Sequence, residues 1–211
     1  MNITLYYCAE TRADRIRWLL EELNLPYKLN NIDIFSGEGQ NKEYLKIHPY
    51  GQVPAIDIDG ELTYESGAIC NILADRFPEK KLSPVVNSQH RAQYEQWMFF
   101  TVASLEPPIF QHLLHTFLLP TELRIPEIAQ WNLKSYRRVL ITLEKIMKIS
   151  LNKSQTDQLY LLDIGFSCAD IMLGSILFWA PEIVSKYPTL YRYSENLKNR
   201  KAYQRTILTY C

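Results

Sequence analysis

The chain has 211 residues, 47% hydrophobic and 22% charged, and its 23 lysine and arginine residues balance 23 aspartate and glutamate residues. This composition is typical of a soluble globular protein with a sizeable core. The zero formal charge gives no basis for a nucleic-acid or membrane-binding surface. No apolar run reaches the roughly 20 residues of a membrane span, and the start of the chain lacks the basic and apolar parts of a signal peptide. We therefore expect a cytoplasmic protein.

The cysteines are scattered and show neither a CxxC motif nor the spacing of a zinc site. We expect reduced thiols and no metal site. They are Cys8, Cys70, Cys168 and Cys211.

The first 80 residues alternate strand and helix patterns. Residues 3–7 alternate and are rich in β-forming residues, which predicts a first strand. Apolar residues at helical spacing, with charges opposite, predict a helix over 13–23 that ends at Asn24-Leu25-Pro26. The further elements predicted in this half are a strand over 27–34, a short helix over 42–47, a hairpin of 55–58 and 62–63 around Asp59-Gly60, and a helix over 66–76.

The segment from Phe77 to Pro84 has no periodicity and contains two prolines, which is typical of a linker between domains. No strand pattern follows it. Helical patterns are predicted over 89–118, 126–147, 168–179 and 191–208. The fold class is therefore a small α/β domain, residues 1–80, followed by a larger all-helical domain, residues 89–211.

The motif that says most about function is Gln52-Val53-Pro54-Ala55-Ile56, followed by Glu65-Ser66-Gly67-Ala68-Ile69. If Val53-Pro54 is cis, the N–H and C=O of Val53 can pair with an extended peptide ligand. Only roughly 5–6% of X–Pro bonds in folded proteins are cis, so the dipeptide needs its context. Both halves fall at matching places in a βαβαββα pattern.

Four segments, in order, resemble the cytosolic glutathione S-transferases over nearly the whole chain. They are residues 17–27, His48-Pro49-Tyr50-Gly51-Gln52-Val53-Pro54, Glu65–Ile69, and Phe166-Ser167-Cys168-Ala169-Asp170-Ile171. The first helix and Ser104-Leu105-Glu106-Pro107-Pro108 are similar to a bacterial and fungal branch. The resemblance implies a thioredoxin-like domain that binds glutathione, an all-helical second domain and a homodimer.

The resemblance implies that glutathione lies along the backbone of Val53, next to Gln52 and the cis Pro54. Its γ-glutamyl carboxylate would meet Ser66 at the start of a helix, because such helix ends bind anions. Glu65 would accept from its ammonium group. The alternative is that Glu65 and Ser66 only cap that helix.

The glycine carboxylate of glutathione calls for a cation, and Lys42 is the prediction, with Lys46 next. Many members of the family carry a lysine where this chain has Tyr50 or Gln52, so this contact is expected to be rearranged. The alternative is a solvated lysine.

Ser167 and Asp170 precede an apolar helix with the spacing of a capping box. In the family this box is structural, so we assign both residues to folding.

The glutathione thiol is a poor nucleophile at neutral pH and must be drawn toward its thiolate. Family members use a tyrosine at the end of the first strand, or a serine or cysteine in the next loop. Thr11 stands at the serine position, with Arg15 four residues later, and its hydroxyl lies near a helix start that favours anions. Tyr6 is the rival and has a packing role as its alternative. Cys8 and Tyr7 rank behind both, since Cys8 precedes the usual position by three residues.

The electrophile is expected to meet the thiolate beside the first long helix of the second domain. That helix is aromatic, and most such residues belong to cores. Helical spacing from Glu106 gives a predicted electrophile pocket of Phe99, Ala103, Glu106 and Phe110, with Val102 beside it. His112 and His115 are interpreted as surface residues.

The predicted function is transfer of glutathione, as co-substrate, to a small hydrophobic electrophile in detoxification, or peroxide reduction by the same thiolate. One alternative is a non-catalytic binding module with this fold. The other is a glutathione-dependent thiol–disulfide reductase.

Overall fold

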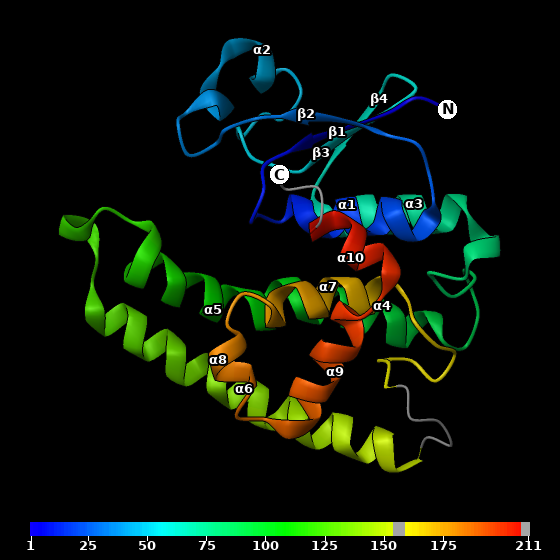
Figure 1. Ribbon diagram of the computed structural model, residues 1–211, viewed down its shortest axis with the longest axis vertical. Helices are drawn as coiled ribbons and strands as arrows, with labels where there is room; N and C mark the ends of the chain where they lie inside the picture. Colours follow the sequence, from blue (N-terminus) through cyan, green and yellow to red (C-terminus); the bar gives the residue numbers. More distant parts are fainter. Residues whose placement is uncertain (154–158, 208–211) are drawn as a thin grey trace. The chain divides into compact units, whose positions relative to one another are not determined.

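The computed structural model describes residues 1–153 and 159–207 and consists of two compact units (Figure 1). One unit contains residues 1–88 and the described residues from 198 onward, and the other contains residues 89–197. The first unit is a thioredoxin-like domain and the second is helical. The predicted fold class is therefore confirmed.

A mixed four-stranded sheet with the order β2-β1-β3-β4 forms the centre of the first unit. Its strands are β1 (Ile3–Tyr7), β2 (Lys28–Asn31), β3 (Ala55–Ile58) and β4 (Glu61–Tyr64). β1 pairs with β2 in parallel and with β3 antiparallel, and β4 pairs antiparallel with β3. The second strand is shorter than the predicted 27–34. It is an edge strand whose four residues are all exposed, so no core contact extends the pairing.

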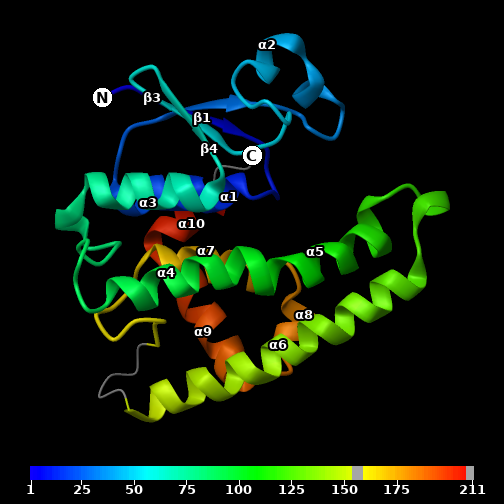
Figure 2. The ribbon, with the colours of Figure 1, turned by 180° about the vertical axis from the view of Figure 1, so that it is seen from behind.

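The helices α1 (Ala13–Leu23) and α3 (Ser66–Arg76) have the predicted bounds and lie side by side along one face of the sheet (Figures 1 and 2). The predicted apolar face of α1 is buried, with Ile16, Leu19 and Leu20 fully covered. The smaller elements of this unit are α2 (Lys42–Leu45) and two 3-10 turns, Glu38–Gln40 and Pro78–Lys80.

The last described helix, α10 (Lys201–Ile207), belongs to the first unit rather than to the helical one. The rings of Trp18 and Tyr203 meet edge to face at 5.0 Å. Arg200 donates two hydrogen bonds to Glu22, at 2.6 and 2.9 Å. The predicted domain spanning 89–211 therefore differs from the observed grouping, because these contacts fix α10 to α1.

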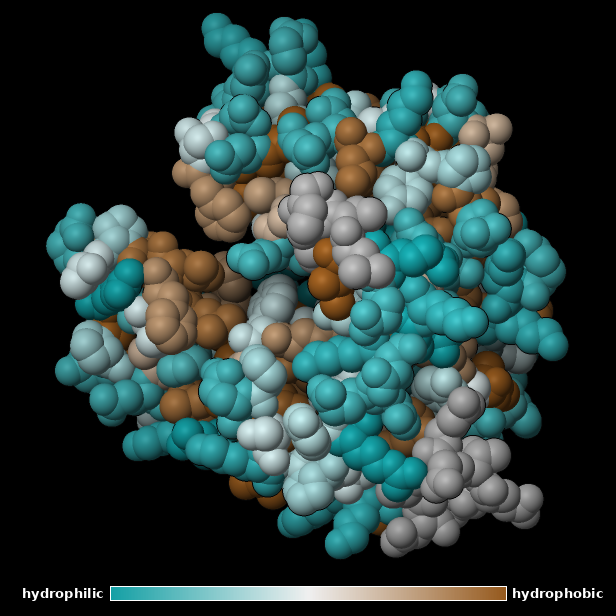
Figure 3. Space-filling model, in the orientation of Figure 1, coloured by the Kyte–Doolittle hydropathy of each residue, from teal (hydrophilic) through white to brown (hydrophobic). Residues whose placement is uncertain are grey.

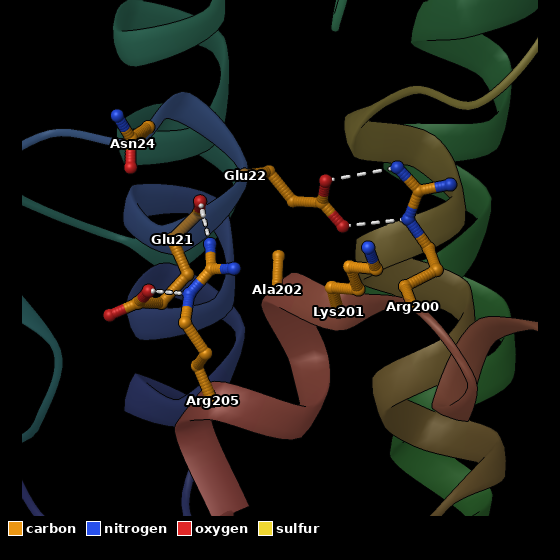
Figure 4. A pocket seen from close by; sticks show the side chains of 7 residues that line it. All are labelled: Glu21, Glu22, Asn24, Arg200, Lys201, Ala202 and Arg205. Carbon is orange, nitrogen blue, oxygen red and sulfur yellow. Dashed lines mark hydrogen bonds and ion pairs between the residues drawn. The ribbon is translucent and has the colours of Figure 1, made fainter.

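A second ion pair joins the same helices, since Arg205 Nε lies 2.6 Å from a carboxylate oxygen of Glu21 (Figure 4). Between the two pairs lies a pocket of about 360 Å³ with charged walls. It is lined by Glu21, Glu22, Asn24, Arg200, Lys201, Ala202 and Arg205. Both arginines that line the pocket are paired with carboxylates of α1. The two ion pairs therefore hold α10 against α1.

The second unit is built from helices, as predicted. They are α4 (Arg91–Phe100), α5 (Glu106–Leu113), α6 (Pro126–Lys153), α7 (Cys168–Leu177), α8 (Pro181–Val184) and α9 (Pro188–Lys198), with π-helical turns at Thr101–Leu105 and Leu114–Leu118 and a 3-10 turn at Thr121–Leu123. The predicted helix over 191–208 is two helices, α9 and α10. The first π-helical turn precedes Pro107 and Pro108, which have no N–H to donate to the preceding turn.

The helix α7 forms the core of this unit, and its predicted capping box is confirmed. The fully buried Asp170 accepts from the N–H groups of Leu161 and Ser167, both at 2.9 Å, and from the hydroxyl of Tyr193 at 2.9 Å. Burial raises the pKa of Asp170 to about 6, although these hydrogen bonds oppose the shift. The residue joins three chain segments, which fits the predicted structural role.

The end of the second unit between α5 and α6 exposes large apolar side chains, and Figure 3 shows hydrophobic residues gathered there. The exposed side chains in this stretch are Phe117, Leu118, Leu123, Ile125 and Trp131. Within 1–153 and 159–207, no helix combines the length and the apolar character needed to cross a membrane.

Candidate functional site

Three chain segments with site residues meet at one end of the sheet. Since β3 runs antiparallel to β1, Ala55 at the start of β3 pairs with Tyr6 near the end of β1. Ala55 also pairs with Tyr64, the last residue of β4. The end of β1, the Val53-Pro54 loop and the start of α3 at Glu65 are therefore neighbours.

The Val53-Pro54 bond is cis, as the resemblance implies. The Val53 side chain is buried, while no residue that the structure describes forms a hydrogen bond with the Val53 backbone. The side chain of Gln52 is exposed. This loop thus presents a backbone N–H and C=O that can pair with an extended ligand.

Two glycines allow the loop to approach the segment before α2. Gly51 has φ +65°, and a Cβ there would lie 2.4 Å from the carbonyl oxygen of Gly39. A Cβ on Gly39 would lie 2.2 Å from the carbonyl oxygen of Gly51. Both positions therefore exclude any side chain.

Glu65 has a backbone conformation that non-glycine residues rarely adopt, with φ 71° and ψ 109°. Such strain in a folded protein is often found at functional sites. The Glu65 carboxylate is exposed and has no hydrogen-bond partner in the described part of the chain. The Glu65 side chain makes no capping hydrogen bond at the start of α3.

Ser66 is 5% exposed, and its Oγ accepts a hydrogen bond from Nη1 of Arg15 at 3.2 Å. Arg15 itself is 1% exposed. The start of α3 therefore combines helix N–H groups, a hydroxyl and a buried cation, and all three favour a bound carboxylate.

Thr11 lies in the loop between β1 and α1, close to Cys8. Its hydroxyl donates to the carbonyl oxygen of Cys8 at 2.6 Å and accepts from the N–H of Ala13 at 3.1 Å. A hydroxyl has a single proton to donate. Donation to a thiolate would therefore require the side chain to leave the Cys8 carbonyl.

The two tyrosines at the end of β1 have different surroundings. Tyr7 is buried, and its hydroxyl donates to a carboxylate oxygen of Asp14 at 2.7 Å. Tyr6 is half-buried, with its ring 5.8 Å from that of Tyr44. Burial raises the pKa of Tyr6, and the charge of Asp57 adds to the shift. Tyr6 is thus a protonated donor that packs against α2.

Cys8 is a poor candidate nucleophile. Burial raises the pKa of its thiol, and the carboxylates of Asp33, Asp14 and Glu10 raise it further, although a backbone hydrogen bond from Ile34 opposes the shift. The thiolate is therefore disfavoured.

The two candidate cations for the glycine carboxylate differ in their engagement. Lys46 pairs with Glu43 at 2.6 Å. Lys42 is exposed and has no partner among residues 1–153 and 159–207. Lys42 is therefore the cation that a ligand can recruit without breaking an ion pair.

Residues 4–81 match the family model of the glutathione S-transferase N-terminal domain. The chain is 41% identical over 99 residues to Glutathione S-transferase hmp2 of Hypomyces subiculosus, a match that covers 46% of each chain. The chain thus spans about half the length of this relative. It is 26% identical to the Disulfide-bond oxidoreductase YfcG of Escherichia coli, over 98% of this chain and 94% of that protein.

The similarity to solved structures extends over the whole length of the chain. A glutathione transferase homolog from Lodderomyces elongisporus, solved with two glutathione molecules per subunit, superposes with a TM-score of 0.89 at 22% identity. That match covers 100% of both chains. Residues 4–81 therefore match a glutathione S-transferase N-terminal domain, and the chain as a whole shares the fold of the glutathione transferase homolog.

The predicted electrophile residues all lie in the second unit. Phe99 is 66% exposed and Ala103 is exposed, whereas Glu106 is 5% exposed. Phe110 is half-buried and lies 6.5 Å from Trp179, ring to ring. Phe99 and Ala103 are therefore accessible to a ligand, whereas the Glu106 side chain is buried.

Three residues near the glutathione motifs were missed by sequence reasoning as site residues. They are Arg15 beneath Ser66, Tyr44 in α2 and His48 before the loop. Arg15 sits among the apolar residues of α1, and only its burial distinguishes it from a solvated charge. In the described ranges no group of histidine, cysteine, aspartate and glutamate side chains could hold a metal ion.

Proposed function

We propose that this protein binds glutathione at the end of its sheet and transfers it to a small hydrophobic electrophile or uses it to reduce a peroxide. The observation that carries the proposal is the meeting of the cis-proline loop with the Glu65–Ser66 helix start at one sheet end. Val53 would pair with the ligand backbone, Glu65 with its ammonium and Ser66 with its carboxylate. Lys42 would hold the glycine carboxylate.

The proposed thiol activator is Thr11, with Tyr6 as the rival. Thr11 lies at the loop before α1, where the helix dipole favours an anion. Its bond to Cys8 must open for it to donate, while the Tyr6 hydroxyl has no partner among the described residues. The activated thiolate would attack the electrophile, for which Phe99, Ala103 and Phe110 are the proposed binding residues. We further propose a cytoplasmic homodimer.

The test is glutathione binding by isothermal titration calorimetry with Glu65→Gln and Ser66→Ala. Hydrogen bonds to charged groups contribute about 1.5–3 kcal/mol, so each change should weaken binding about 10- to 100-fold. The control is Glu61→Gln, which removes a carboxylate of the same sheet that is paired with Arg76 and lies at the other end of β4. No glutathione binding by the wild type would refute the proposal.

The second candidate function is glutathione-dependent disulfide reduction, favoured by the match to YfcG over 98% of the chain. In that reaction the bound thiolate attacks a disulfide sulfur, the S–S bond breaks and the leaving thiolate takes a proton. The thiolate of a second glutathione then attacks the glutathione sulfur of the mixed disulfide, that S–S bond breaks, the other thiolate leaves and takes a proton, and glutathione disulfide forms. The raised pKa of Cys8 favours glutathione over a protein thiol as the nucleophile.

A comparison of substrates separates these activities. A purified sample should conjugate an aromatic halide at a rate above the uncatalysed reaction if it is a transferase. Faster reduction of a small mixed disulfide with no conjugation would favour the reductase. Glutathione binding without either activity would favour a binding module.

A further inference from the structure

Two buried side chains hold the loop that carries Val53. The hydroxyl of Tyr44, in α2, donates to the carbonyl oxygen of Gln52 at 2.6 Å. His48 accepts a hydrogen bond on Nδ1 from the N–H of Tyr50 at 3.3 Å. Tyr44 and His48 are each 4% exposed. The loop is therefore fixed from both sides before it reaches the cis proline.

The bond to Gln52 acts on the peptide unit that contains the Val53 N–H. In a trans peptide the carbonyl oxygen and the following N–H point in opposite directions within one plane. Gln52–Val53 is trans, since the cis bond of this loop is Val53-Pro54. Fixing the Gln52 oxygen therefore fixes the direction of the Val53 N–H. A hydrogen bond to the oxygen also polarises the peptide and strengthens the N–H as a donor.

The surroundings of Tyr44 keep its hydroxyl in the donating form. Burial strongly raises the pKa of Tyr44, and the nearby Tyr6 adds to the shift. The Tyr6 ring lies 5.8 Å from the Tyr44 ring at an interplanar angle of 52°. Tyr6 thus supports the ring whose hydroxyl holds the loop.

We propose that Tyr44 is a positioning residue for glutathione, because its hydroxyl orients the Gln52–Val53 peptide so that the Val53 N–H faces the ligand backbone. This inference rests on the proposed function, in which glutathione lies along Val53. Tyr44 does not touch the thiol, so its effect is on affinity for the glutathione backbone.

The test is Tyr44→Phe, which keeps the ring and removes the hydroxyl. The matched control is Tyr136→Phe in α6, because Tyr136 is also fully buried and its hydroxyl has no hydrogen-bond partner among the described residues. Affinities for glutathione and for S-methylglutathione are measured by calorimetry. Unfolding is followed in parallel, and the amide signal of Val53 is followed by NMR.

We expect Tyr44→Phe to weaken both ligands equally, by about 3- to 10-fold, as for loss of one hydrogen bond. The Val53 amide signal should move in the free protein, and kcat at saturating glutathione should be unchanged. Tyr136→Phe should bind like the wild type. Affinities within about twofold of the wild type, or a loss for glutathione alone, would overturn the inference. A wild type that binds no glutathione would instead refute the proposed function.

Discussion

Replacing Thr11 with alanine separates the structural role of its hydroxyl from a catalytic one. The hydroxyl makes two hydrogen bonds, to the carbonyl oxygen of Cys8 and from the N–H of Ala13. Each net contribution is about 0.5–1.5 kcal/mol, so Thr11→Ala should lower the free energy of unfolding by about 1–3 kcal/mol. Thr116→Val is a control, because it removes a hydroxyl that bonds to the His112 carbonyl oxygen in the second unit.

A catalytic role of Thr11 would show in the thiol pKa and in kcat/KM rather than in the free energy of unfolding. A free cysteine thiol has a pKa near 8.5, so only about 3% is thiolate at pH 7. If Thr11 donates to the bound thiolate, Thr11→Ala should raise the pKa of bound glutathione and lower kcat/KM by on the order of 10²-fold. Glutathione affinity should change little, and Thr11→Ser should retain activity because the donor survives.

The assay combines conjugation of an aromatic halide with the ultraviolet absorbance of the bound thiolate, titrated against pH. Tyr6→Phe is measured beside it, since this change keeps the ring against Tyr44. A Thr11→Ala variant with wild-type kcat/KM, together with an inactive Tyr6→Phe variant, would show that the enzyme is of the tyrosine type. That result would contradict the assignment to Thr11.

Three further outcomes are expected. Asp170→Asn should lower the free energy of unfolding by about 1–3 kcal/mol at pH 7, because an amide nitrogen would face the Ser167 N–H. Burial raises the pKa of Asp170 in the folded protein to about 6, so the stability that its protonation contributes is present below about pH 4 and is lost as the pH rises through about 6. In denaturant unfolding, the difference in stability between the wild type and the variant should therefore be larger at pH 5 than at pH 7. Arg200→Gln should lower the melting temperature more than Arg76→Gln, because Arg200 and Glu22 are the more buried pair, and the difference should shrink in salt. Sedimentation should give a dimer mass, and a monomer at all concentrations would refute the proposed assembly.

The sequence predicted those elements in which local pattern and tertiary burial agree. The predicted bounds of residues 3–7, 13–23 and 66–76 agree with the structure, and most of their apolar residues are buried, although Arg15, Arg17 and Ser66 are buried with them. The cis Val53-Pro54 bond was implied by the resemblance of residues 48–54 to the cis-proline loop of the glutathione transferases, since the dipeptide alone does not specify it.

Other features depend on contacts that no local pattern carries. The break between α9 and α10 falls in a continuous helical pattern, and only Arg200 and Tyr203, which bind residues far back in the chain, explain where α10 packs. The roles of Tyr44 and Arg15 likewise rest on partners at Gln52 and Ser66. A buried arginine in an apolar helix has the same sequence signal as a surface one.

The undecided thiol activator follows from the same physics. A backbone site can be predicted from sequence, because cis geometry and strand order fix where N–H and C=O groups point. A hydroxyl donor depends on one rotatable proton, and the Thr11 proton has an internal acceptor at Cys8, whereas the Tyr6 hydroxyl has none in the described residues. Ligand binding must therefore supply more than the Thr11–Cys8 bond provides before Thr11 can act. A neutral hydrogen bond is worth about 1 kcal/mol net and one to a charged group about 1.5–3 kcal/mol, so a thiolate is a sufficient acceptor to draw the proton away.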